Sequence, residues 1–202
     1  MKKIGTHKQT GILPVINIPN VSLAIDIAKA IRNGGINSIE VTLRSADSLE
    51  SIKTIKEAFP DMCVGAGTVL DCNTVDKALA AGADFIVCPG YDEKIVDYCI
   101  SKNVEVVPGC TSASEIQHAV GKGLTLLKFF PAELSGGLEA IKLLSGPFPN
   151  VKFVPTGGIN FKNLGSYLEN EKILACGGSY MATAEQIKNR DFCALLPPAK
   201  KL

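Results

Sequence analysis

Short apolar runs rich in β-branched residues alternate with longer segments of helical periodicity along this sequence, and the alternation limits the folds open to the chain. Eight such runs are each followed by a segment with helical character, which predicts a parallel sheet covered by helices. The predicted strands are 12–18, 38–43, 62–66, 83–88, 104–107, 124–129, 152–155 and 173–176. The predicted helices are 22–33, 46–59, 73–81, 92–102, 112–122, a segment around 138–144, 163–169 and a weaker segment from 183 onward.

Eight βα units in 202 residues favour closure of the sheet into a (β/α)8 TIM barrel. The alternative is an open doubly wound sheet, which usually has fewer strands at this length. No glycine-rich turn spells G-x-G-x-x-G with an acidic residue about 20 positions later, so a dinucleotide site is disfavoured. Because no linker or run of charge divides the chain, we predict a single barrel domain over residues 1–202.

The charge balance argues against several classes of partner. The chain has 21 Lys and Arg against 20 Asp and Glu, and aromatic residues make up 6% with no Trp, so we expect no nucleic-acid partner. No stretch approaches the roughly 20 apolar residues that span a bilayer, and no signal peptide is recognisable, so we expect no membrane partner.

The cysteine and histidine patterns bear on redox setting and metal binding. Seven Cys include no CxxC pair, and the two histidines, His7 and His118, are far apart in sequence. These patterns predict a reducing, cytoplasmic setting without disulfides and without a metal site. Cys110 follows a predicted strand, but no histidine is placed to activate it as a nucleophile.

Lys128 is the most informative residue at a predicted strand end, where a barrel carries its chemistry. It follows the run Leu124–Leu127 and precedes two phenylalanines, so we expect its amine to be largely desolvated. Loss of water disfavours the ammonium ion and makes a neutral, nucleophilic amine available. The alternative is a lysine that reaches solvent at the barrel mouth or pairs with a carboxylate.

Glu40 and Arg44 lie four residues apart, so the alternation of a strand places them on one face with Thr42. If that face points inward, Glu40 can act as a general base and Arg44 can hold a carboxylate with its planar fork. The alternative is an ion pair between the two side chains.

Glycine pairs follow the last two predicted strands, at Gly157-Gly158 and at Gly177-Gly178 before Ser179. The loops after strands seven and eight of a barrel often bind phosphate through exposed backbone N–H groups. Tight turns would also explain these glycines, but their occurrence at both loops favours a phosphate site.

Several stretches in this order resemble the KDPG/KHG aldolases, the 2-dehydro-3-deoxy-6-phosphogluconate and 4-hydroxy-2-oxoglutarate aldolases. The resemblance extends from about Gly11 to Thr183. The stretches are EVTLR at 40–44, VGAGTV at 64–69, KFFPAE at 128–133, Gly136-Gly137, GPF at 146–148 and PTGGI at 155–159. It implies a (β/α)8 barrel, a homotrimer and a carbon–carbon lyase that uses neither metal nor cofactor.

The resemblance also implies roles for individual residues. Lys128 matches the lysine that forms the Schiff base, and Glu40 matches the general acid/base. Arg44 and Thr68 match residues that hold the pyruvate carboxylate and ketone. Further matches are Thr156 for substrate discrimination, Pro89 and Phe130 for the pocket lining, and Gly157, Gly158, Gly178 and Ser179 for the phosphate.

The activity implied is cleavage of the phosphorylated 2-oxo sugar acid 2-dehydro-3-deoxy-6-phosphogluconate to pyruvate and glyceraldehyde 3-phosphate. Cleavage of 4-hydroxy-2-oxoglutarate to pyruvate and glyoxylate is a second candidate. Two other interpretations stay open: a phosphate-binding isomerase or epimerase with Glu40 as base and Lys128 as an electrostatic group, and a non-catalytic barrel that binds a phosphorylated metabolite.

Overall fold

The structure, a computed structural model, describes residues 11–179, 182 and 184–189, which form eight strands alternating with helices. The strands are β1 (Ile12–Ile16), β2 (Ser38–Thr42), β3 (Cys63–Gly67), β4 (Phe85–Val87), β5 (Glu105–Val107), β6 (Leu126–Phe129), β7 (Lys152–Pro155) and β8 (Cys176–Gly178). The helices are α1 (Ala24–Asn33), α2 (Ser48–Ala58), α3 (Cys72–Ala80), α4 (Glu93–Ser101), α5 (Ala113–Gly121), α6 (Gly137–Ser145), α7 (Leu164–Leu168) and α8 (Ala184–Lys188). Two 3-10 turns, η2 (Val21–Leu23) and η3 (Glu133–Ser135), precede α1 and α6.

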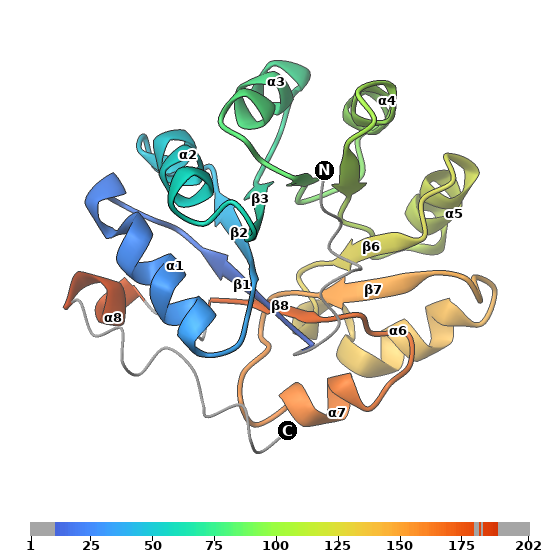
Figure 1. Ribbon diagram of the computed structural model, residues 1–202. Helices are drawn as coiled ribbons and strands as arrows, with labels where there is room; N and C mark the ends of the chain where they lie inside the picture. Colours follow the sequence, from blue (N-terminus) through green and yellow to red (C-terminus); the bar gives the residue numbers. More distant parts are fainter. Residues whose placement is uncertain (1–10, 180–181, 183, 190–202) are drawn as a thin grey trace.

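The parallel strands close into a barrel. Six of them pair in the order β5-β4-β3-β2-β1-β8, and β6 pairs with β7. A bridge between Gly109 and Lys128 joins the end of β5 to β6, and a bridge between Thr156 and Gly177 joins the end of β7 to β8. The predicted barrel is therefore confirmed over the open sheet, and the helices lie around the outside of the strands (Figure 1).

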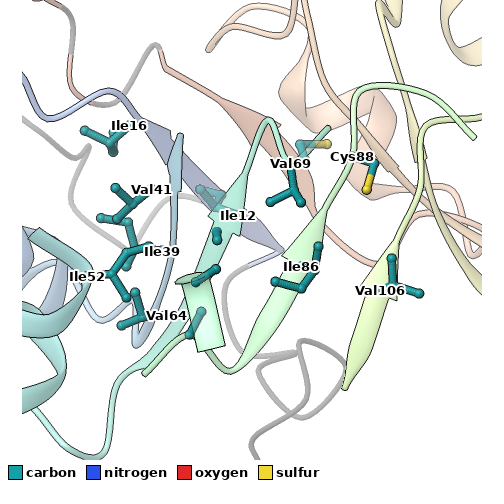
Figure 2. Close-up of a cluster of buried hydrophobic side chains, with 14 of the residues drawn as sticks. Ile12, Ile16, Ile39, Val41, Ile52, Val64, Val69, Ile86, Cys88 and Val106 are labelled. Atoms are coloured by element: carbon teal, nitrogen blue, oxygen red, sulfur yellow. The ribbon is translucent and has the colours of Figure 1, made fainter. Parts of the chain in front are cut away.

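Side chains alternate between the two faces of the barrel wall. Outward residues such as Ile39 and Val41 of β2 and Val64 of β3 pack with Ile52 of α2 in the layer between strands and helices (Figure 2). Inward apolar residues form a second cluster of Leu13, Cys63, Phe85, Val87, Val107, Val154 and Ala175. Burial of apolar area in both layers drives folding, and the inner face fixes which residues meet inside the barrel.

Polar residues in the βα loops start several helices. Asp71 accepts a hydrogen bond from the Thr74 N–H at 2.7 Å, and Asp92 accepts one from the Ile95 N–H at 3.0 Å. Ser112 and Glu115 form a reciprocal capping box at the start of α5. These caps mark where α3, α4 and α5 begin, with four to five residues between each helix and the strand that precedes it.

The eighth strand differs from its predicted position. We expect it at 173–176 from the apolar run, but the ladder with β1 begins at Cys176 and continues through Gly178. Ile173 makes an isolated bridge to Phe153 instead. Gly177 and Gly178 therefore lie within a strand rather than in a loop, and the absent side chain of Gly177 makes room for the Thr156 hydroxyl.

Some expectations concern residues outside the described ranges. His7, Cys193 and the outer bounds of the predicted domain are among them. Over the residues that are described, no helix is both long and apolar enough to cross a membrane. No cluster of three or more His, Cys, Asp or Glu suited to a metal ion occurs among those same residues.

Candidate active site

A cavity of about 440 Å³ opens at the carboxyl ends of the strands. Every site residue predicted from the sequence lines it. These residues are Glu40, Arg44, Thr68, Pro89, Lys128, Phe130, Thr156, Gly157, Gly158, Gly178 and Ser179. The strands that carry them lie far apart in sequence, and closure of the barrel brings them together.

Lys128 and Glu40 form a buried ion pair across the barrel. Lys128 is on β6 and Glu40 on β2, both on the inward face, and Lys128 Nζ lies 3.3 Å from Glu40 Oε1. Lys128 is 7% exposed and Glu40 is 1% exposed. Nζ also lies 5.3 Å from the centroid of the Phe130 ring. The expected burial of Lys128 is confirmed, and so is pairing with a carboxylate, which we gave as the alternative.

Gly67 makes room for the carboxylate of Glu40. A Cβ atom at Gly67 would lie 2.7 Å from Glu40 Cγ and would overlap Oε1. The registers place Glu40 beside Gly65 and Thr42 beside Gly67 on β3. The absent side chain therefore lets the Glu40 carboxylate lie against the backbone of β3, within reach of Lys128.

Arg44 is held by Thr42, the last residue of β2, rather than by Glu40. Its Nε donates to Thr42 Oγ1 at 3.3 Å, and the Thr42 hydroxyl donates to the Ile16 carbonyl at 3.4 Å. Within the described part of the chain Arg44 has no carboxylate partner. The alternative of a Glu40–Arg44 ion pair is therefore wrong, because Lys128 provides the positive charge beside Glu40. The exposed Arg44 guanidinium stays available to an anionic group in the cavity.

Thr68 has an unusual backbone conformation for a β-branched residue, with φ at 62°. Hydrogen bonds on both sides hold it there. The Leu43 N–H donates to the Gly67 carbonyl at 2.8 Å, and the Val69 N–H donates to the Val87 carbonyl at 3.2 Å. Strain of this kind persists only where the surroundings enforce it, and it is common at binding sites.

The far side of the cavity is formed by the ends of β7 and β8. Gly157 and Gly158 both have positive φ, at 97° and 84°, which side chains other than glycine rarely adopt. Gly178 ends β8 and the exposed Ser179 follows it. These backbone segments and the Ser179 hydroxyl lie where we expect the phosphate.

Three further residues line the cavity and are missed by the sequence analysis: Val15, Thr42 and Ile159. Thr42 had a signal, because strand alternation puts it on the face of Glu40 and Arg44. Val15 and Ile159 are apolar residues whose sequence context does not distinguish them from the core.

The cysteines do not provide a nucleophile in this region. Burial raises the pKa of the Cys88 and Cys110 thiols to about 12, so both are protonated at neutral pH. The expectation that Cys110 is inert agrees with this shift.

The sequence profile described as "KDPG and KHG aldolase" matches residues 4–196. The chain belongs to this family. The family is one of carbon–carbon lyases, which agrees with a buried lysine beside a carboxylate in a barrel mouth.

Individual members are similar over most of their length. The 2-dehydro-3-deoxy-phosphogluconate aldolase of Treponema pallidum is 42% identical over 181 residues, covering 90% of this chain and 86% of that protein. The KHG/KDPG aldolase of Escherichia coli K12 is 36% identical over 181 residues, covering 90% and 85%. The crystal structure of KDPG aldolase from Legionella pneumophila, with pyruvate captured at low pH as a covalent carbinolamine intermediate, matches with a TM-score of 0.92 at 36% identity. It covers 96% of this chain and 95% of that chain.

Proposed function

We propose that this protein is a class I aldolase that cleaves 2-dehydro-3-deoxy-6-phosphogluconate to pyruvate and glyceraldehyde 3-phosphate through a Schiff base on Lys128. The observation that carries the proposal is the buried pair in the cavity, with Lys128 Nζ 3.3 Å from Glu40 Oε1. A nucleophilic lysine needs a group that takes up its proton, and a carboxylate within hydrogen-bond reach is such a group.

The first steps form the imine. The Lys128 amine attacks the C2 carbonyl carbon, and the carbonyl oxygen gains a proton to give a carbinolamine. Glu40, directly or through a water, carries protons between the amine and this oxygen. Loss of water then leaves a protonated imine between Nζ and C2. The covalent route divides one difficult cleavage into easier steps.

The imine then accepts the electrons of the bond that breaks. The C4 hydroxyl loses its proton to a base, for which Glu40 is the candidate, and the C3–C4 bond breaks. Glyceraldehyde 3-phosphate leaves, and the electron pair of the broken C3–C4 bond moves toward the imine to give an enamine on Lys128. Protonation at C3 and addition of water to the imine release pyruvate and restore the amine.

The remaining cavity residues hold the two ends of the substrate. Arg44, which has no carboxylate partner among the described residues, would hold the pyruvate carboxylate, and Thr68 follows the neighbouring strand β3. Gly157, Gly158 and Ser179 would bind the phosphate with backbone N–H groups and a hydroxyl, beside Gly178 at the end of β8. Such positioning turns a two-body encounter into an oriented reaction.

The relatives support the substrate class. Those from Treponema pallidum and Escherichia coli are named as aldolases for 2-dehydro-3-deoxy-phosphogluconate, the latter also for KHG. The Legionella pneumophila enzyme holds pyruvate as a carbinolamine.

We further propose a homotrimer, following the family resemblance. Light scattering on the purified protein would test this assembly.

The test compares kcat/KM for pyruvate release from three compounds: 2-dehydro-3-deoxy-6-phosphogluconate, its C4 epimer and 4-hydroxy-2-oxoglutarate. We expect release from the first, with a higher kcat/KM than for the unphosphorylated compound. An isomerase would change the sugar acid without producing pyruvate, and a non-catalytic barrel would leave it unchanged. Either result would overturn the proposal.

A further inference from the structure

We propose that Glu133 and Tyr167 are positioning residues, which hold the loop Gly157–Ile159 so that its backbone N–H groups face the substrate phosphate. The inference rests on the proposed function and extends it to residues outside the cavity lining. Neither side chain needs to touch the substrate. Both act through the shape of the loop after β7.

Hydrogen bonds fix three successive carbonyl groups of this loop. The Ala132 N–H donates to the Thr156 carbonyl at 2.8 Å, and the Glu133 N–H donates to the Gly157 carbonyl at 3.1 Å. The Gly158 carbonyl accepts from the side-chain amides of Asn160 and Asn163, each at 3.1 Å. Each of the three peptide planes is therefore held in a fixed orientation.

This orientation determines where the N–H groups point. In a trans peptide the N–H and the preceding C=O point in opposite directions, so the N–H groups of Gly157, Gly158 and Ile159 face away from these bonds. All three residues line the cavity. Within the described part of the chain no acceptor is bonded to these N–H groups. Successive N–H groups of this kind suit the binding of an anion.

Glu133 supports the loop with its side chain as well as its backbone. A Cβ atom at Gly158 would lie 2.7 Å from Glu133 Cβ and would overlap Cγ, so the side chain of Glu133 packs directly on the glycine. The Glu133 carboxylate then accepts a hydrogen bond from the Tyr167 hydroxyl of α7. Gly137 leaves room for this bond, because a Cβ there would lie 3.1 Å from both bonded oxygens.

Tyr167 is well suited to anchor Glu133. It is 2% exposed, so its ring is fixed in the core between α7 and the barrel. Burial, and then the bond to Glu133, raise the pKa of Tyr167, so its hydroxyl stays a donor at physiological pH. Glu133 follows Lys128 by five residues. The short segment between them therefore also sets the spacing between the nucleophile and the phosphate loop.

The test is Tyr167→Phe, which removes the hydroxyl and keeps the ring. The matched control is Tyr98→Phe, because the Tyr98 hydroxyl donates to Asp76 at 2.7 Å on the surface between α4 and α3, outside the cavity lining. For each protein we would measure KM and kcat for 2-dehydro-3-deoxy-6-phosphogluconate and for 4-hydroxy-2-oxoglutarate. Inorganic phosphate would be tested as an inhibitor of cleavage of the unphosphorylated compound.

We expect Tyr167→Phe to raise KM for the phosphorylated substrate and the inhibition constant of inorganic phosphate by roughly threefold to tenfold, the effect of about one hydrogen bond. Kinetics with 4-hydroxy-2-oxoglutarate should change less than twofold, which a general structural defect would not allow. Tyr98→Phe should behave as the wild type. If Tyr167→Phe folds poorly, Glu133→Ala is the second variant to test, and it should produce the same selective loss.

Equal losses for both substrates, or no loss for either, would overturn the role of Glu133 and Tyr167 while the aldolase activity of the wild type stands. Failure of the wild-type protein to release pyruvate from any substrate would instead overturn the proposed function.

Discussion

Lys128 Nζ lies 3.3 Å from Glu40 Oε1, although the two residues are 88 positions apart in the chain and on strands that are not neighbours. Both side chains are buried. Burying two charges is costly unless each compensates the other, so a pair of this kind indicates a functional requirement more than a gain in stability. The pair provides an amine and a proton acceptor at one point of the cavity.

Replacing Glu40 by Gln should remove the proton acceptor while keeping the shape of the side chain. We expect Glu40→Gln to slow turnover by roughly 10²–10⁴-fold, the usual contribution of a general acid/base. Steady-state cleavage of the phosphorylated substrate measures the effect. An unchanged kcat would reduce Glu40 to a structural partner of Lys128.

Gly67→Ala tests whether the position of the Glu40 carboxylate matters for catalysis. The added Cβ would overlap Oε1, so the Glu40 carboxylate must leave its present position, from which it contacts Lys128. We expect a large loss of kcat in a protein that still folds, as judged by circular dichroism. The control is Gly121→Ala at the end of α5, where a Cβ would meet no atom within 4 Å. Full activity in Gly67→Ala would contradict a requirement for this geometry.

Thr42→Val should weaken the hold on the keto-acid carboxylate through Arg44. Valine keeps the size of the side chain but removes the hydroxyl that accepts the 3.3 Å bond from Arg44 Nε. We expect the pyruvate concentration for half-maximal imine formation to rise roughly threefold to tenfold, the effect of about one ordinary hydrogen bond, because Arg44 itself keeps its charge. Unchanged pyruvate binding would mean that Arg44 is oriented without Thr42.

Buried thiols should make the fold less stable at alkaline pH. Burial raises the pKa of Cys88, Cys99, Cys110 and Cys176 from 9.0 to about 12. Between these pH values the unfolded chain loses thiol protons that the folded chain keeps, so stability is retained below pH 9 and falls as pH rises toward 12. The limit is about 1.4 kcal/mol per thiol per pH unit.

Urea unfolding from pH 7 to pH 10.5 measures this dependence. Cys99→Ala isolates one thiol from the other groups that titrate in the range, and its stability should fall less steeply than that of the wild type above pH 9. Parallel curves for the two proteins would show that the Cys99 thiol contributes nothing.

Much of the site could be predicted from sequence because its residues stand at strand ends. Parallel strands in a barrel all present their carboxyl ends to one mouth, so local order along the chain identified Lys128 and Glu40 without knowledge of distances. Thr68 was assigned by the family resemblance. The glycine pair Gly157-Gly158 could be found because it follows the seventh predicted strand. Both residues have positive φ, which explains why glycine is needed there.

The partner of Glu40 could not be predicted in this way. Arg44 is its neighbour by strand periodicity, but Lys128 reaches it only after the barrel has closed through the bridge at Gly109. The predicted start of the eighth strand is also wrong. Glycines carry little strand signal, and the apolar residues before them form only an isolated bridge. The contact of Glu133 with Gly158 likewise depends on tertiary structure alone.

The most direct measurement is reductive trapping of pyruvate. The protein is incubated with pyruvate, reduced with borohydride and digested, and the modified peptide is identified by mass spectrometry. We predict a pyruvate-derived adduct on the Lys128 side chain, and no adduct there in Lys128→Ala. An adduct on another lysine, or no adduct on a protein that is otherwise folded, would contradict the central role of this amine.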